Sequence, residues 1–533
     1  MKTQFKQAKP LLPSELQVLQ QLFQGGRIPE AQARAKKLLV AHPHELALYN
    51  ILGLCQQAQG DIKGAVSSFR KMLAINPAIA ELHFNLGVML TQLGDAKAAM
   101  ASYRKALQLK ANFTVAHFNL AVLLQNAHSF DEAVDHYQRA VALEPGFYEA
   151  LGNLGTLRQQ RGQLAAAEQC YRQALAVHPD ARGYFNLGTT LYDQGEHEQA
   201  LTAFREAVSL DPQFAEAWNN LGETLRDRGD MDEAIRCYKQ ALAVQPGYDR
   251  ANYNLGEFFC LAGRLHEAIP YFEGCQFADA QERALQCYYK TSQFEVFKDK
   301  LTQLTAQGKH RSVLLSTLAT HYASNFGVAD PYNFCKEPMA FVQHTRIEEL
   351  AAPDSPLLAQ LLHDIQHLAI AERKQGRLYY GMQSAGNLLQ RSEASYQHLA
   401  ALIRAKVQAY QRHFAGSGCE IIAGFPDTVE FTSSWYLRMK KGGYLTSHIH
   451  EEGWISGCVY LQLPAKNDAH EGSFEYSTDG DDYPRLHDQF PSHIVDQVVG
   501  DLVLFPSSLF HRTLPFHSDQ ERVCVAFDVK PPV

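Results

Sequence analysis

The chain has 533 residues, of which 46% are apolar and 20% are charged, with 49 Lys and Arg against 57 Asp and Glu. This composition is typical of a folded globular protein and excludes a disordered or fibrous chain. A formal net charge of −8 provides no overall positive field for nucleic acid or an anionic membrane, so we expect neither as the main partner.

The N-terminal segment MKTQFKQAKPLLPSELQVLQQLF has no uninterrupted apolar core, which argues against a secretory signal. No apolar run approaches the roughly 20 residues that a membrane-spanning helix needs. The ten cysteines are scattered from Cys55 to Cys524 without a CxxC pair, a usage typical of reduced and buried thiols. We therefore expect a cytoplasmic protein.

A repeat with a period of 34 residues extends from residue 12 to about residue 280. Each unit after the first has a small residue for helix packing, a second small residue twelve positions later, and an aromatic four positions further on, whereas the first unit is degenerate and lacks the aromatic, as expected for a capping repeat. The first set is Gly53, Gly87, Ala121, Gly155, Gly188, Gly222 and Gly256, and the aromatics are Phe69, Tyr103, Tyr137, Tyr171, Phe204, Tyr238 and Phe272. Small residues let two helices approach closely, and a proline near the end of most units stops the second helix.

This pattern resembles the tetratricopeptide repeat, with about eight units between residues 12 and 280. The resemblance implies helix pairs that stack into a right-handed superhelix with a long concave face. Residues 281–330 keep the helical pattern without the period, so we expect additional helices that connect the repeats to the next domain.

A row of asparagines lies two residues before the helix-packing positions. An amide offers both donors and an acceptor, so such a row is able to hold the backbone of an extended peptide substrate. The arrangement is similar to the asparagine ladder of the nucleocytoplasmic O-GlcNAc transferase, and the alternative is that these residues cap or link neighbouring helices. The row consists of Asn85, Asn119, Asn153, Asn186, Asn220 and Asn254.

Residues 331–533 change in character. We expect supporting helices over 355–414 and a β core over 418–533. The predicted strands are EIIAGF, VEFTSSWYLRM, YLTSHIH, ISGCVYLQL, GSFEYST, DQVVGDLVLFP and ERVCVAFDV. Short strands separated by turns favour a jelly-roll, or double-stranded β-helix. The predicted fold class is therefore an all-α repeat superhelix followed by an α+β jelly-roll domain.

The candidate chemistry lies in the last strands. His448 and His450 alternate on one face of a strand end, His511 follows a later strand, and Arg522 lies eleven residues beyond it. Three imidazoles hold a first-row divalent metal and leave open coordination positions. An arginine beside them is suited to a bidentate pair with a carboxylate.

These residues resemble the iron(II) and 2-oxoglutarate-dependent oxygenases. The resemblance is closer to a bacterial group in which HxH precedes SGxxYL, and GxLxLFPSxLxH precedes ERxxxAF. The matching segments are His448-Ile449-His450, SGCVYL from Ser456, GDLVLFPSSLFH from Gly500 and ERVCVAF from Glu521. The resemblance implies Fe(II), 2-oxoglutarate and O2, with Arg522 and Tyr460 holding the cosubstrate and its decarboxylation yielding succinate and CO2.

The chain departs from the superfamily at position 450, where most members have an acidic ligand. Strand alternation favours His450 as the third ligand and turns Glu451 to the opposite face. Glu451 or Glu452 is the alternative if the strand ends at His450, and two histidines with water are a further one. We expect His493 to be a surface or loop residue and Cys524 to be a small buried side chain.

The leading hypothesis is a 2-oxoglutarate-dependent dioxygenase that hydroxylates a protein or peptide substrate held by the repeats. One alternative is an interaction scaffold with a degenerate oxygenase domain. Another is a three-histidine metal enzyme that does not use 2-oxoglutarate. The substrate and the oligomeric state do not follow from the sequence.

Overall fold

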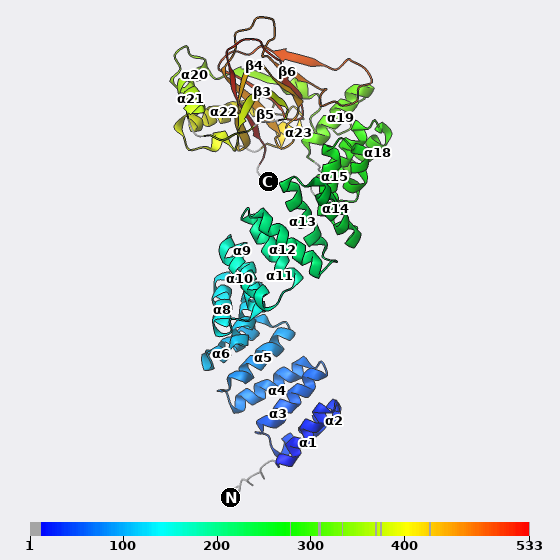
Figure 1. Cartoon of the computed structure of the whole chain (residues 1–533), viewed down its shortest axis with the longest axis vertical. Coiled ribbons are helices and arrows are strands. Elements are labelled where there is room, and N and C mark those ends of the chain that lie inside the picture. Colours follow the sequence, from blue (N-terminus) through cyan, green and yellow to red (C-terminus); the bar gives the residue numbers. More distant parts are fainter. Residues whose placement is uncertain are drawn as a thin grey trace. The chain divides into compact units, whose positions relative to one another are not determined.

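The computed structural model describes residues 12–277, 279–306, 311–332, 334–367, 370–373, 376–425 and 428–531 (Figure 1). Contacts divide the chain into two compact units, Met1–Ala251 and Asn252–Val533. Among the described residues, no helix is both long enough and apolar enough to cross a membrane.

The first unit consists of antiparallel helix pairs that follow the sequence repeat. They are α1 (Pro13–Gln24), α2 (Ile28–Ala41), α3 (Leu46–Ala58), α4 (Ile62–Ile75), α5 (Ala80–Gln92), α6 (Ala96–Leu109), α7 (Thr114–Asn126), α8 (Phe130–Leu143), α9 (Tyr148–Gln160), α10 (Leu164–Val177), α11 (Ala181–Asp193), α12 (His197–Leu210), α13 (Ala215–Arg228) and α14 (Met231–Val244). The boundary to the second unit falls within α15 (Asp249–Leu261).

The repeat motif has a direct steric cause. A Cβ added at Gly87 would lie 2.6 Å from the Tyr103 ring, and one at Gly222 would lie 2.6 Å from the Tyr238 ring. At these two positions only glycine lets the aromatic of the second helix pack this closely on the first, whereas Ala121 occupies the equivalent position opposite Tyr137. The second helix α4 ends at Ile75, two residues before Pro77, because the residue before a proline disfavours helical backbone.

The second unit begins with helices. It contains α15, α16 (Leu265–Glu273), α17 (Ala280–Lys290), α18 (Phe294–Ala306) and α19 (Val313–Phe326). The pair α15/α16 completes the eight helix pairs expected from the repeat, and α17 to α19 are the additional helices expected after it.

A β-rich domain with supporting helices follows. Its helices are η1 (Pro338–Phe341), α20 (Glu348–Ala351), α21 (Pro356–His367), η2 (Leu388–Gln390), α22 (Ala394–His413) and α23 (Glu420–Ala423). Its strands are β1 (Gln343–Arg346), β2 (Glu372–Arg373), β3 (Leu378–Ser384), β4 (Phe431–His448), β5 (Ile455–Gln462), β6 (Phe474–Ser477), β7 (Ser492–Val495), β8 (Asp501–Pro506), β9 (Phe510–Thr513) and β10 (Arg522–Val529).

All pairs between these strands are antiparallel, in the order β1-β8-β5-β10-β4-β9-β6-β7, with β3 also on β4 and β2 on β3. The long strand β4 pairs with β10 over its first half and with β9 at its end, while β3 pairs with its other edge. This arrangement is nearly barrel-shaped and confirms the predicted jelly-roll class.

Three local predictions were wrong. The segment EIIAGF forms the short helix α23 rather than a strand, and the region 355–414 contains β2 and β3 between its helices α21 and α22. The segments VEFTSSWYLRM and YLTSHIH belong to one bent strand, β4, which ends at His448 rather than His450. The strands β3 and β4 pair with each other across more than fifty residues, so the local pattern did not contain this contact.

Two apolar cores lie on the two faces of the central strands, and the candidate site residues belong to the inner face. On β10, Val523, Val525 and Phe527 face a core shared with α21 and α22, whereas Cys524 and Ala526 face a second core inside the sheet. Because side chains alternate along a strand, Arg522 lies on the same inner face as Cys524.

Candidate metal centre and cosubstrate pocket

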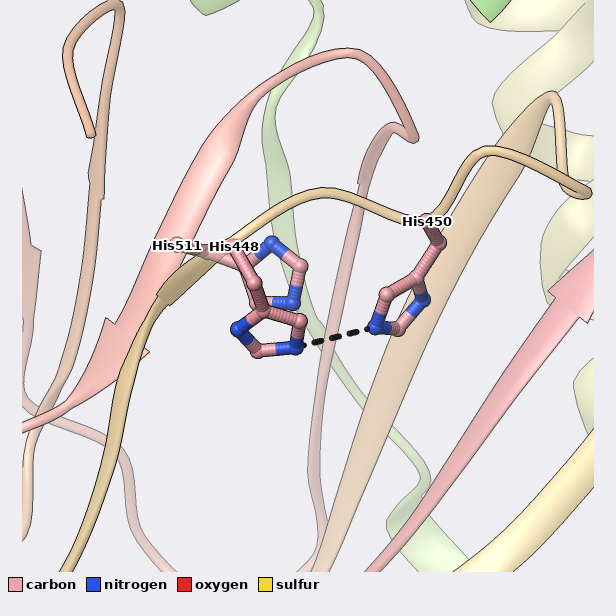
Figure 2. A group of neighbouring side chains, drawn as sticks. All are labelled: His448, His450 and His511. Atoms are coloured by element: carbon pink, nitrogen blue, oxygen red, sulfur yellow. Dashed lines mark hydrogen bonds between the residues drawn. The ribbon is translucent and has the colours of Figure 1, made fainter. Parts of the chain in front are cut away.

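Three histidines from two strands and one loop meet inside the sheet (Figure 2). His448 ends β4 and lies opposite His511 of β9 in register, while His450 lies on the loop after β4. One ring nitrogen from each of the three residues lies within 4.8 Å of the others. The structure therefore brings together the three residues that the sequence pattern selected.

The hydrogen bonds of the three rings orient them for ligation. The Nδ1 of His448 donates to the carbonyl of Thr446 at 2.8 Å, and the Nδ1 of His511 donates to the carbonyl of Leu509 at 3.2 Å. The Nδ1 of His450 donates to the carboxylate of Asp528 at 2.6 Å. In a neutral imidazole with a proton on Nδ1, Nε2 carries a lone pair, which is the form that binds metals.

The distances and pKa shifts fit a divalent cation. The Nε2 atoms of His448 and His450 lie 3.2 Å apart, close to the roughly 3 Å expected for two adjacent imidazole ligands with metal bonds of about 2.1 Å. Two facing lone pairs repel each other, and a shared cation removes that repulsion. Burial and the neighbouring His450 ring lower the pKa of His448 to about 3, and burial also lowers the pKa of His511, so both rings are neutral near pH 7.

Asp528 is the functional candidate that the sequence reasoning missed. Its carboxylate is buried on β10 and accepts hydrogen bonds from His450, from Ser456 at 2.7 Å and from Ser433 at 2.8 Å. Burial alone would raise its pKa, but the His450 ring and these hydrogen bonds hold the pKa below its ordinary value. Most members of the superfamily have an acidic ligand at the position of His450. In this chain Asp528, hydrogen-bonded to His450, supplies the negative charge instead. Asp528 lies six residues after Arg522 on β10, so both side chains are on the same face of the strand. This spacing could have indicated Asp528 from the sequence.

Glu451, the alternative third ligand, turns away from the cluster. It forms an ion pair with Arg283 of α17 at 2.6 Å. Glu451 is thus engaged with the additional helices, whereas His450 faces the other two rings.

An apolar pocket connects the histidines with Arg522. The histidines and Arg522 line this pocket. The other lining residues include Trp435, Leu437, Phe474 and Phe505. Arg522 is 1% exposed and donates to the carbonyl of Gly472 at 3.1 Å and to the Cys524 sulfur at 3.2 Å. Within the described ranges no carboxylate lies at ion-pair distance from it. A buried guanidinium without an acidic partner is costly, so this end of the pocket suits an anionic ligand.

Tyr460 and Cys524, which contact the guanidinium of Arg522, have polar side-chain groups. The guanidinium lies over the ring of Tyr460 at 5.2 Å, and the Tyr460 hydroxyl is buried, although Tyr460 is not among the residues that line the pocket. The hydrogen bond with Cys458 and the charge of Arg522 lower the pKa of Cys524 to about 6 against the effect of burial. Cys524 therefore accepts a hydrogen bond from Arg522 at 3.2 Å, in addition to the apolar role expected for it.

The asparagine row is half-buried at all six positions. Asn119 donates to the hydroxyl of Tyr103 at 3.5 Å, and Asn153 donates to the hydroxyl of Tyr137 at 3.2 Å. Each of these bonds links an asparagine to the aromatic of the preceding repeat. This contact fits the alternative role, in which the asparagines link neighbouring helices. Peptide binding by the row remains a prediction.

The fold combines helix pairs of the tetratricopeptide-repeat type with a C-terminal jelly-roll domain that holds a three-histidine cluster. Residues 433–528 match the family described as "Putative 2OG-Fe(II) oxygenase". Tetratricopeptide-repeat families match residues 20–78, 80–113, 115–147, 153–213, 185–236 and 213–273. The repeat models thus match the N-terminal part of the chain, and the oxygenase model matches residues 433–528 of the C-terminal domain.

Several solved repeat structures are similar to parts of this chain. YrrB, described as a TPR protein with an unusual peptide-binding site, is 24% identical, with 35% of this chain and 97% of that chain covered and a TM-score of 0.33. PilF of Pseudomonas aeruginosa is 23% identical, with 40% and 97% covered and a TM-score of 0.35. The C-terminal part of a TPR repeat-containing protein from Cytophaga hutchinsonii is 15% identical, with 44% and 97% covered and a TM-score of 0.40. No curated protein matches this chain.

Proposed function

We propose that this protein is an Fe(II)- and 2-oxoglutarate-dependent dioxygenase that hydroxylates a protein or peptide substrate. Substrate capture is assigned to the repeats of residues 12–280, connection to residues 281–330, and the chemistry to residues 331–533. We also propose a cytoplasmic location, because all ten cysteines are free thiols.

The observation that carries the proposal is the buried Arg522 at the far side of a pocket that also holds three histidine Nε2 atoms. A scaffold with an empty β domain does not need this charge, and a metal site alone does not need it either. A dicarboxylate with a 2-oxo acid group can bind the metal through the 2-oxo acid and pair with Arg522 through its other carboxylate.

The chain's own residues have separate tasks in this function. His448, His450 and His511 hold the metal, and Asp528 keeps the His450 ring in its binding tautomer. Arg522, with the ring of Tyr460 packed against its guanidinium, orients the distal carboxylate of the cosubstrate. Bound Fe(II) would supply the open coordination positions for the 2-oxo acid and O2. The apolar pocket walls exclude water around these groups.

The test is anaerobic visible absorption of the full-length protein, titrated with Fe(II) and then with 2-oxoglutarate. Bidentate chelation by the 2-oxo acid should produce a weak metal-to-ligand charge-transfer band, and His511→Ala should lose it. Iron binding without a band would favour a three-histidine enzyme that does not use 2-oxoglutarate. Absence of iron binding would favour the scaffold.

A further inference from the structure

Two of the ten cysteines lie in contact inside the C-terminal domain. Cys335 follows α19, and Cys419 precedes α23, 84 residues later. The Cys419 thiol donates a hydrogen bond to the Cys335 sulfur, with 3.1 Å between the two Sγ atoms. This distance is about 1 Å longer than the roughly 2.05 Å of a disulfide bond, so a small movement of the side chains is sufficient to join them.

The backbone holds the two segments together independently of the thiols. The amide of Glu420 donates to the carbonyl of Phe334 at 3.1 Å, so the residues next to both cysteines are hydrogen-bonded to each other. Cys335 is 0% exposed and Cys419 is 3% exposed, and both belong to the apolar core that α21 and α22 share with the sheet. Thiols held in this way reach each other without a change of fold, which a disulfide formed in the native protein requires.

Both thiols lie just beneath the surface. The neighbouring residues 336–337 and 415–418 are exposed, so a small uncharged oxidant needs to pass only one layer of the chain. The hydrogen bond with Cys335 and two backbone N–H groups lower the pKa of the Cys419 thiol, although burial opposes this shift. Cys419 is therefore the sulfur that attacks an oxidant first, because the thiolate is the nucleophilic form.

The two segments also support the loop that holds His450. That loop ends at Trp454, whose ring packs against the ring of Phe334 at a centroid distance of 5.4 Å. A Cβ added at Gly424 would lie 3.3 Å from the same indole, so the segment after Cys419 contacts it as well. A covalent bond between the segments therefore fixes two of the surfaces that hold Trp454 in place.

We propose that Cys335 and Cys419 form a redox-modification site, in which a peroxide joins them in a disulfide that staples the two segments beside the His450 loop. A reducing compartment keeps both thiols free, so the bond forms on exposure to peroxide. The staple goes beyond the proposed oxygenase chemistry and does not depend on it.

The reaction has two steps. The Cys419 thiolate attacks one oxygen of hydrogen peroxide, the O–O bond breaks, and the departing hydroxide takes up the thiol proton to leave as water, which gives Cys419 sulfenic acid. The Cys335 thiolate then attacks the Cys419 sulfur, the S–O bond breaks, and the second hydroxide leaves as water with the Cys335 proton. Two thiols thus lose two electrons and two protons to one peroxide, and an external dithiol reverses the oxidation.

The experiment locates the disulfides of the full-length protein. The reduced protein is treated with a small molar excess of hydrogen peroxide, the remaining thiols are alkylated, and proteolytic peptides are identified by mass spectrometry. We expect two peptides joined through Cys335 and Cys419, together two hydrogens lighter than the separate peptides, and dithiothreitol should release them. The joined peptides should persist in Cys55→Ala, which removes another buried thiol, and should be absent from Cys335→Ala. If both cysteines were alkylated after oxidation, or if either were joined to a different cysteine, the proposal would be overturned.

A thermal measurement on the parent alone tests the staple and needs no variant to fold. The bond closes a loop of 84 residues, so the oxidised protein should show a Tm of the C-terminal domain roughly 4–10 °C higher, and dithiothreitol should reverse the rise. A located disulfide without a rise in Tm would overturn the stapling role. The reaction requires neither iron nor 2-oxoglutarate, so a failed charge-transfer titration would refute the oxygenase chemistry and leave this result unchanged.

Discussion

Asp528→Asn tests how this site functions without an acidic metal ligand. The parent carboxylate accepts the Nδ1 proton of His450 at 2.6 Å, and two serine hydroxyls complete its hydrogen bonds. Asparagine keeps the size and one carbonyl oxygen, so the His450 ring has room to stay in place. The change removes the negative charge that makes His450 a stronger ligand.

The expected loss of Fe(II) affinity is about 10- to 100-fold, the usual effect of removing a partner of a metal-binding histidine. This range corresponds to about 1.4–2.7 kcal/mol. The burial of Asp528 makes the upper half of the range the better expectation, because a charge-assisted hydrogen bond is stronger away from water.

The assay is an anaerobic Fe(II) titration at saturating 2-oxoglutarate, followed by the charge-transfer band, with thermal unfolding as a check of the fold. Glu451→Gln is the matched control, because Glu451 has the same charge but pairs with Arg283 instead of the cluster. Its iron affinity should stay within about twofold of the parent. If Glu451→Gln lost iron and Asp528→Asn kept it, the assignment of His450 as the third ligand would be wrong.

Three further predictions follow from other parts of the molecule. Arg522→Gln should weaken 2-oxoglutarate binding about 10- to 100-fold while Fe(II) binding stays near the parent value, and equal cosubstrate affinity would remove the carboxylate role. Burial lowers the pKa of His321 below 6.5, so the unfolded chain binds the proton more readily and the parent loses stability as pH falls from 7 to 5. His321→Gln should make this decline of Tm shallower, and an unchanged decline would contradict the reasoning. Replacing Asn153, Asn186 and Asn220 together with Ala should weaken the binding of peptides that depend on the repeats and keep the helical circular dichroism. Unchanged binding would leave only the helix-linking role for these three residues.

The repeats were predictable because the contacts that define them are close in the sequence. Gly87 meets Tyr103 sixteen residues later, and the same contact recurs in other units. A period of this kind needs no knowledge of distant partners. The ligand triad was also accessible, because the motifs around His448, His450 and His511 keep their order and spacing.

The surroundings of the triad were not accessible in the same way. His450 lies beyond the end of β4, so strand alternation does not explain its direction, and its bond to Asp528 spans 78 residues. Glu451 leaves the site because Arg283, from a helix far earlier in the chain, pairs with it. Neither partner is visible from local sequence.

The sequence by itself thus determined the repeat architecture and the types of residue at the centre, since both depend on local spacing. Only the tertiary structure decided which acid supports the third histidine and which acid turns away. The physical reason is that strand register and helix docking bring together groups far apart in the sequence, 78 residues for His450 and Asp528 and 168 for Arg283 and Glu451, and these contacts set the charge and hydrogen bonding of the site.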